Sequence, residues 1–118
     1  MMLNKGEIAG KRILKPETIA LMTRNHIGDL HVAVDGTRPQ PGGEQVRFGL
    51  DFAVHTDPKS VGLPFGTGTY YWGGAASTIF WVDPIEDLVV IFMTQLMPSA
   101  TFNFRGQLKS IIYPAIVD

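Results

Sequence analysis

The histidine and serine residues of this chain are not spaced as in a known catalytic or metal-binding motif. The sequence has 118 residues and no cysteine, which excludes disulfides, thiolate catalysis and cysteine-ligated metals. His26, His31 and His55 lack a ligand spacing such as His-x-x-x-His, so we interpret them as histidines of loops or strand edges. Ser77 could belong to a catalytic triad, but no Gly-x-Ser-x-Gly elbow surrounds it. We expect no metal site and no cofactor.

Two pairs of glycines could place backbone against a ligand. Gly66 and Gly68 in "FGTGTY" lack the rest of a phosphate-binding fingerprint, which favours a simple turn. Gly73 and Gly74 follow Trp72 in "YYWGGAASTIFWVDP", where the sequence predicts that a strand begins. Glycine weakens a strand and usually marks a bulge or the close approach of a ligand or another backbone. The residues alone leave both interpretations open.

The composition excludes several classes of partner. The net charge is −1, with neither a basic stripe for nucleic acid nor an acidic tail for a basic partner. The longest apolar run, "LVVIFM", has the length of a strand and not of a membrane span. The first residues lack the apolar stretch of a signal peptide, so the chain as it stands is expected in the cytoplasm. We expect a single domain over residues 1–118.

The elements that must position these residues can be read along the chain. Residues 15–25 predict a short helix with Pro16 at its first position. Residues 36–45 are rich in glycine and proline and predict a surface loop. Residues 47–55 alternate between apolar and other side chains, as one strand does. Residues 55–70 predict a second loop.

The last third of the chain predicts a hairpin and a helix. Residues 78–82 and 88–95 are apolar strands joined by the turn "DPIED", whose acidic residues we interpret as solvated. The C-terminal segment carries apolar residues at helical spacing, and Pro114 is expected to end or kink that helix. The apolar residues of this stripe are Leu108, Ile111, Ile112, Ala115 and Ile116. The predicted fold is α+β, an antiparallel sheet of about three strands with the C-terminal helix on one face. Nothing obvious covers the other face.

Three segments together resemble the C-terminal part of the serine β-lactamase-like family. They are "LNKGEIAGKRILKPETIALM", "FGLDFAVHTDP" and "YYWGGAASTIFWVDPIEDLVVIFMTQLMPS". The family groups class C β-lactamases, penicillin-binding DD-peptidases and family VIII carboxylesterases, which hydrolyse esters, β-lactams or amides through an acyl-enzyme. The resemblance covers nearly the whole chain, but the family's enzymes are much longer. It therefore implies a C-terminal fragment of such a hydrolase.

The family's nucleophile motif, Ser-x-x-Lys, is absent. Three residues after each of the four serines stands an apolar or aromatic residue, and no Tyr-x-Asn occurs either. The resemblance places Trp72, Gly73 and Gly74 where the family has Lys-Thr-Gly, as the wall beside the substrate. It also makes the backbone N–H of Ala75 one of two oxyanion-hole donors. The tryptophan would offer an apolar wall in place of a cation, which favours neutral esters.

These observations lead to three hypotheses of different classes. The preferred one is a fragment of a serine hydrolase that is inactive alone, because its nucleophile and its second oxyanion donor are missing. The second is a self-associating structural or binding module derived from such an enzyme. The third is a working hydrolase that uses Ser77 or another serine in an unrecorded way. The uncovered sheet face predicts a homo-oligomer or a complementary N-terminal fragment as the partner, with no nucleic acid and no membrane.

Overall fold

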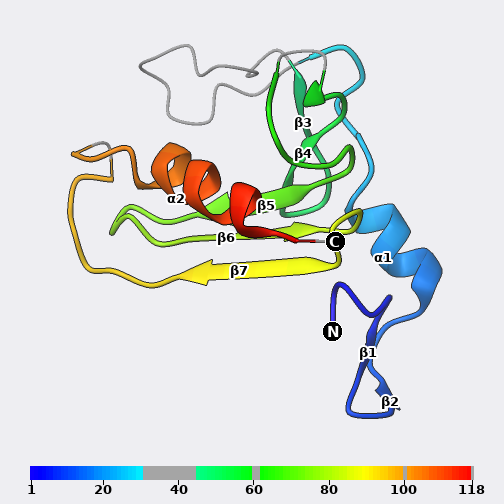
Figure 1. The fold of residues 1–118 in the computed structure, drawn as a ribbon. Helices are drawn as coiled ribbons and strands as arrows, with labels where there is room; N and C mark the ends of the chain where they lie inside the picture. Colours follow the sequence, from blue (N-terminus) through cyan, green and yellow to red (C-terminus); the bar gives the residue numbers. More distant parts are fainter. Residues whose placement is uncertain (31–44, 60–61, 100, 118) are drawn as a thin grey trace.

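A five-stranded antiparallel sheet with one helix across a face forms the body of the protein (Figure 1). The computed structural model describes residues 1–30, 45–59, 62–99 and 101–117. The strands follow one another in the order of the chain. They are β3 (Val46–Phe48), β4 (Ala53–His55), β5 (Tyr70–Gly73), β6 (Ile79–Asp83) and β7 (Leu88–Phe92). The class is α+β as expected, but the prediction of about three strands was too low.

Two strands exceed the prediction: β5 precedes the strand expected at 78–82, and residues 47–55 do not form one strand. The chain reverses there, so that β3 and β4 pair antiparallel with Val46 opposite His55 and Phe48 opposite Ala53. Asp51 adopts a φ of 73°, in the left-handed region that turns use, and the N–H of Gly49 donates to the carbonyl of Phe52. A side chain at Gly49 would overlap the carbonyl oxygen of Met22. The apolar alternation continues through the turn and conceals it.

The predicted hairpin and C-terminal helix are confirmed. Strands β6 and β7 pair in continuous register from Ile79 opposite Phe92 to Asp83 opposite Leu88. Helix α2 (Phe104–Ile112) begins at Asn103, whose side chain accepts a hydrogen bond from the N–H of Gly106. It passes into a 3-10 turn, η3 (Tyr113–Ala115), which contains the proline that was expected to end it.

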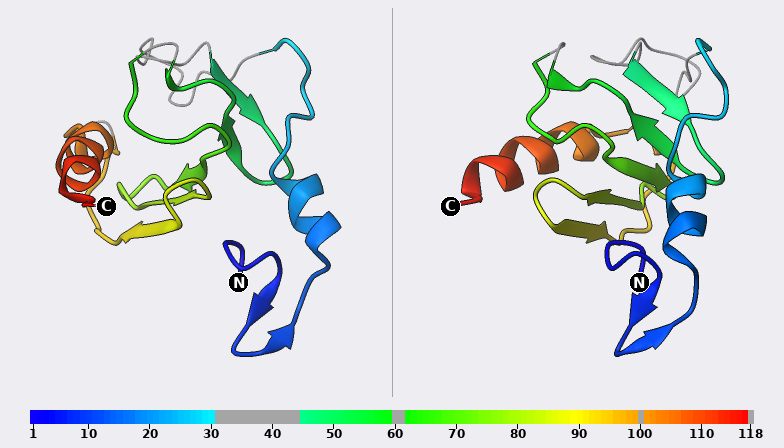
Figure 2. Two further views of the ribbon diagram at one scale, coloured as in Figure 1. Left: turned by 45° about the vertical axis from the view of Figure 1, so that its right-hand side comes forward. Right: turned by 90° about the vertical axis from the view of Figure 1, so that its right-hand side faces the viewer.

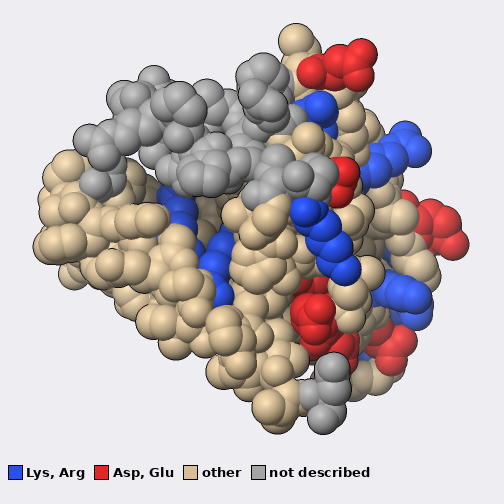
Figure 3. Space-filling model, turned by 45° about the horizontal axis from the view of Figure 1, so that its top comes forward, with Lys and Arg blue, Asp and Glu red and all other residues tan. Residues whose placement is uncertain are grey.

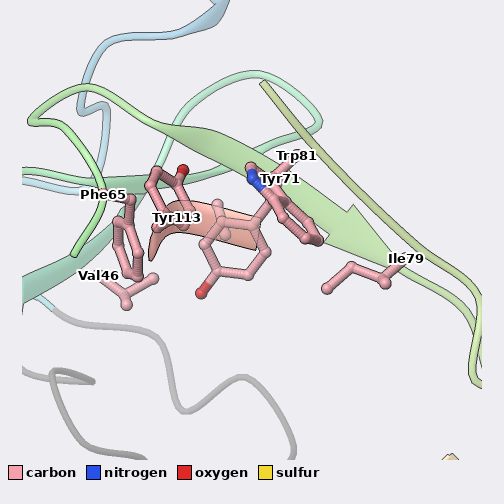
Figure 4. Packing of buried hydrophobic residues seen from close by; sticks show 7 residues of the cluster. Val46, Phe65, Tyr71, Ile79, Trp81 and Tyr113 are labelled. Carbon is pink, nitrogen blue, oxygen red and sulfur yellow. The ribbon is translucent and has the colours of Figure 1, made fainter. Parts of the chain in front are cut away.

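Helix α2 covers one face of the sheet and completes the main core. Leu108 and Ile112 of α2 pack against a cluster drawn from β3, β4, β5, β6 and the loop before β5, and Tyr113 of η3 belongs to it. Figure 4 shows the labelled members of this cluster gathered on one side of the sheet. They are Val46, Phe65, Tyr71, Ile79, Trp81 and Tyr113. The aromatic share of this core is high, which places several polar ring atoms in it.

The opposite face of the sheet is only partly covered. Met2 and Leu3, from the first residues of the chain, pack on a smaller cluster that includes Val82 of β6. Further along the same face, Trp72 is 40% exposed and Ile91 is 67% exposed. The register places these side chains with Val82, because Trp72 pairs with Phe80 and Phe80 with Ile91. Much of this face is therefore apolar and open.

The N-terminal segment projects from one side of the sheet (Figure 2). It holds a small hairpin, β1 (Glu7–Ile8) and β2 (Lys11–Arg12), followed by helix α1 (Pro16–Met22). Pro16 occupies the first turn of α1 as predicted. The helix is shorter than the expected residues 15–25 and attaches to the β3–β4 turn through the N–H of Leu50, which donates to the carbonyl of Met22. The expected loop over residues 36–45 lies outside the described residues except for Gln45.

Candidate functional site

The motif singled out by sequence lies at the end of β5, where the chain turns toward β6. Gly73 is the last residue of the strand and pairs with Ile79, and Gly74 begins the five-residue turn that returns the chain. The expectation that a strand begins here was wrong, since β5 starts two residues earlier, at Tyr70. The β5–β6 register is continuous from Tyr70 to Gly73, so those residues contain no bulge.

The structure shows what approaches these glycines within the chain itself. A Cβ on Gly73 would lie 2.8 Å from the carbonyl oxygen of Thr78 and 2.5 Å from the guanidinium of Arg105 on α2. A Cβ on Gly74 would lie 2.6 Å from the hydroxyl of Thr78. The N–H of Gly74 donates to the carbonyl of Thr78 at 3.0 Å and closes the turn. Glycine at both positions therefore allows a tight turn and lets a cation from α2 approach β5.

The turn leaves Ala75 exposed and with an available backbone donor. Its neighbours bond within the turn, as the N–H of Ser77 donates to the carbonyl of Gly74 at 3.1 Å. The N–H of Ala75 donates no hydrogen bond to any part of the chain that the structure describes. Trp72 lies at 40% exposure on the open face, edge-on to Phe48 with ring centroids 5.2 Å apart. An unpaired N–H on an exposed residue is suited to bind the oxygen of a polarised carbonyl.

Ser77 is placed as a structural residue of this turn. It is 5% exposed, adopts a φ of 64°, and its hydroxyl donates to the carbonyl of Leu96 at 2.7 Å. The N–H of Leu96 in turn donates to the carbonyl of Ala76. These two bonds join the β5–β6 turn to the segment after β7. A carbonyl oxygen cannot take up the proton of a serine nucleophile, so this arrangement does not activate Ser77.

Asp83 accepts four hydrogen bonds, and the expectation that it lies in a solvated turn was wrong. It is fully buried at the end of β6. One carboxylate oxygen accepts from the N–H of Gly66 and the hydroxyl of Tyr113, both at 2.8 Å. The other accepts from the N–H groups of Ile85 and Glu86, at 3.0 and 3.3 Å. Asp83 thus ties three separate segments together.

These hydrogen bonds decide the charge of the carboxyl group. Burial alone raises the pKa of Asp83, but the donors from Gly66, Tyr113, Glu86 and Ile85 together outweigh it and lower the pKa below its usual value. Burial and the hydrogen bond to Asp83 both raise the pKa of Tyr113, so its phenol stays protonated and donates to Asp83. Asp83 is therefore an ionised, fully paired carboxylate with no capacity left for a ligand or a proton.

His55 was expected in a loop or at a strand edge, and this was wrong. It ends β4, which pairs with β3 on one side and β5 on the other, and it is 4% exposed. Its ring stacks on Tyr71 at 5.0 Å, and Nδ1 has no hydrogen-bond partner in the described part of the chain. Burial first, then the charge of Lys109, lower the pKa of His55 to about 3. The imidazole is neutral at ordinary pH. His31 lies outside the described residues.

Lys109 of α2 is the cation that reaches into this core. Its ammonium nitrogen lies 3.8 Å from the ring centroid of Phe65, 5.1 Å from that of Tyr71 and 5.8 Å from that of Trp81. Burial, and then the charge of Arg105, lower the pKa of Lys109 to about 8, although Asp83 acts in the opposite direction. The sequence contained one indication that Lys109 faces the core, since it stands three residues before Ile112 on the apolar stripe of the helix.

Two negative findings apply to the described residues only. Within them, no group of three or more His, Asp or Glu side chains is arranged to hold a metal ion. None of their helices is long and apolar enough to cross a membrane.

The chain belongs to the β-lactamase family, as the motif at the end of the central strand β5 suggests. The family model described as Beta-lactamase matches residues 7–110. The serine β-lactamase-like resemblance drawn from the sequence is thereby confirmed.

Two sequence relatives and one solved structure match most of this chain. Protein Rv1367c of Mycobacterium tuberculosis (strain ATCC 25618 / H37Rv) is 36% identical over 106 residues, which are 87% of this chain and 26% of that protein. The uncharacterized protein MT1414 of strain CDC 1551 / Oshkosh matches to the same extent. Among solved structures, "EstCE1, a hydrolase with promiscuous acyltransferase activity" superposes with a TM-score of 0.72 at 26% identity, covering 95% of this chain and 27% of that one. The chain thus spans about a quarter of the length of these relatives.

Proposed function

We propose that this chain forms the oxyanion-binding strand of a serine hydrolase that acts on esters through an acyl-enzyme. The observation that carries the proposal is the exposed N–H of Ala75, which is unpaired in the described structure and follows two glycines at the end of β5. Trp72, three residues earlier in the chain, is 40% exposed and apolar, which favours a neutral acyl group over a charged one. Family membership and the likeness to the hydrolase EstCE1 support this reaction class.

We further propose that the chain is inactive by itself. No serine of the sequence is followed three residues later by lysine, so no paired nucleophile and base are present. One oxyanion donor remains where two are needed, and removing one donor costs about 3 to 4 kcal/mol in other hydrolases. A second chain that carries the nucleophile, corresponding to the part of the relatives that this chain does not match, is the partner that would complete the site.

The test is ester hydrolysis with p-nitrophenyl butyrate. The chain alone is expected to give no rate above buffer. Co-expression with the unmatched part of EstCE1 is expected to give turnover. Replacing Ala75 by proline removes the N–H donor and should then reduce kcat by about 100-fold, whereas Ala75→Gly keeps the donor and should retain most of it. Turnover by the chain alone, or equal rates for the two variants, would contradict the proposal.

A second candidate function is self-association, and the open face of the sheet favours it. Val89, Ile91 and Trp72 expose apolar surface along that face, and monomers seldom leave a large contiguous patch of this kind uncovered. Light scattering on the purified chain would detect a dimer. Ile91→Lys should then dissociate it, whereas Ile111→Lys on the outer side of α2, where the side chain is also 67% exposed, should not. A monomer at all concentrations would exclude this function.

A further inference from the structure

Strand β7 forms one edge of the sheet, and its outer side has no strand paired to it. The strand order places β7 last, with only β6 beside it (Figure 1). In an antiparallel pair every second residue directs its N–H and C=O away from the neighbouring strand. Within the described part of the chain, the backbone of residues 88–93 makes no hydrogen bond outside the β6–β7 ladder. A row of backbone donors and acceptors is therefore open along this edge.

The opposite edge, β3, is protected against further pairing. It has three residues, Arg47 lies in its middle, and the carbonyl of Phe48 accepts from the N–H of His26 at 2.8 Å. Proteins block sheet edges with short strands, charges, prolines or bulges. Strand β7 has five residues without a charge or a proline, and its register with β6 contains no bulge. None of these devices operates at β7.

Charge is also absent from the chain that follows β7. From Leu88 to Phe104 the sequence contains no Asp, Glu, Lys or Arg, and Asp87 stands directly before the strand. In Figure 3 most of the charged atoms lie on the right, which is the side of α1 in Figure 1, and the surface on the left is largely uncharged. An apolar edge without charges is a template for one more strand.

Three apolar side chains line this edge on the open face of the sheet. Val89, Ile91 and Met93 are 46%, 67% and 75% exposed. They alternate with less exposed residues of β7 that pack against the main core. A strand added to the edge would cover this exposed row together with the open backbone.

We propose that two copies of this chain pair antiparallel through β7, with Ile91 at the centre, and join their sheets into one. With this centre Ile91 lies opposite Ile91 of the other copy and Val89 lies opposite Met93, so each exposed side chain of the row meets an apolar one. A centre at Val90 would instead place Met93 opposite Asp87. The antiparallel direction also keeps the two copies of Asp87 at opposite ends of the pair, whereas a parallel pair in register would place them side by side. The same surface serves both copies, as in most two-fold dimers.

The size of this interface predicts a weak dimer. Residues 88–94 of each copy take part, which buries on the order of 1,000 Å² in total, the lower limit for a specific interface. We therefore expect the dimer in concentrated solution and the monomer on dilution. The proposal specifies the self-association considered above and rests on it, and it is independent of the hydrolase proposal.

The experiment is disulfide cross-linking of single-cysteine variants in concentrated solution. The chain has no cysteine of its own, so each introduced thiol reports on one position. Ile91→Cys should form a disulfide between copies at least about tenfold faster than Ile111→Cys, because directly opposite residues lie within disulfide range. Ile111 is the matched control, since both side chains are 67% exposed and Ile111 lies on α2.

A mixture of two variants tests the register. Val89→Cys and Met93→Cys should each link slowly alone, because in this pairing equivalent residues of the two copies lie about 14 Å apart along the strands. Mixed together, they should form the mixed disulfide at a rate similar to that of Ile91→Cys, which intact mass identifies. Hydrogen exchange needs no substitution and should show residues 88–93 of the natural chain more protected in concentrated than in dilute solution, with α2 unchanged.

Each opposite result has a distinct meaning. A dimer in which Ile91→Cys links no faster than Ile111→Cys overturns the edge pairing and leaves association through the open face, because sheets packed face to face lie about 10 Å apart, beyond disulfide range. A monomer at all concentrations overturns both this proposal and self-association. A monomer that associates only when co-expressed with the unmatched part of EstCE1 assigns the edge to that chain and overturns the pairing of two copies.

Discussion

Replacing Asp83 by asparagine should remove a large part of the stability of this fold. The side chain keeps one carbonyl oxygen for the turn, but an amide NH2 group replaces the oxygen that accepts from Gly66 and Tyr113. The N–H of Gly66 is then buried opposite another donor, which costs about 1 to 3 kcal/mol, and the charge assistance of the remaining bonds is lost. We expect a loss of about 2 to 4 kcal/mol, a considerable fraction of the usual 5 to 15 kcal/mol.

Urea unfolding followed by tryptophan fluorescence measures this loss, because Trp81 is fully buried in the core. With a slope of about 1 to 1.5 kcal/mol per molar, the midpoint should fall by about 2 M for Asp83→Asn. The matched control is Asp87→Asn in the same turn. Asp87 is exposed at a φ of 52°, which asparagine tolerates, so its midpoint should move little. Equal shifts for the two variants would refute the reasoning.

The stability lost in Asp83→Asn is also expected to depend on pH. The pKa of Asp83 is lower in the folded state than its usual value near 3.9, so its contribution is fully present above about pH 4. That contribution is lost as the pH falls through the lower, folded pKa. The stability difference between the natural chain and Asp83→Asn should therefore narrow in acid below about pH 4. A constant difference between pH 7 and pH 2 would show that the carboxylate is not the stabilising form.

Three further outcomes follow from the geometry of the core and the turn. Gly73→Ala should lower stability by about 1 to 3 kcal/mol, because its Cβ meets the carbonyl of Thr78, whereas Gly74→Ala meets a side-chain hydroxyl and should cost less; thermal unfolding compares them. His55→Gln should remove the loss of stability between about pH 6.5 and pH 3, since the folded pKa of about 3 lies below the unfolded one and protonation favours unfolding; urea midpoints across that range will show it. Lys109→Met should abolish a rise in stability between about pH 8 and pH 10, because the amine has a lower pKa in the folded state; a rise that persists in the variant would assign it elsewhere.

Local patterns in the sequence were sufficient to predict the elements in the last third of the chain. The β6–β7 hairpin follows from two apolar runs around a proline turn, and α2 follows from its apolar period and ends beside Pro114. The break between β3 and β4 could not be found this way. It depends on the left-handed φ of Asp51 and on the contact of Gly49 with Met22, which is a tertiary contact with α1. A period-two pattern continues through such a reversal unchanged.

The buried polar residues were missed for a related reason. His55 and Asp83 stand beside glycine-rich or proline-rich segments and so suggested solvent exposure. Their burial depends on α2 and the turn after it, which bring Lys109 and Tyr113 over the end of the sheet. Pairing across 30 residues, as between Tyr113 and Asp83, leaves no local signal. The approach of Arg105 to Gly73 was hidden in the same way.

The most direct test of the central claim is intact-mass spectrometry of the purified chain after exposure to a fluorophosphonate probe, which reacts with activated serines. The proposal that this chain contributes an oxyanion-binding strand without a nucleophile predicts no adduct, even after prolonged exposure. The same probe should label a complex in which another chain supplies the serine, and only on that chain. A stoichiometric adduct on any serine of this chain alone would contradict the account and, once mapped, identify the nucleophile.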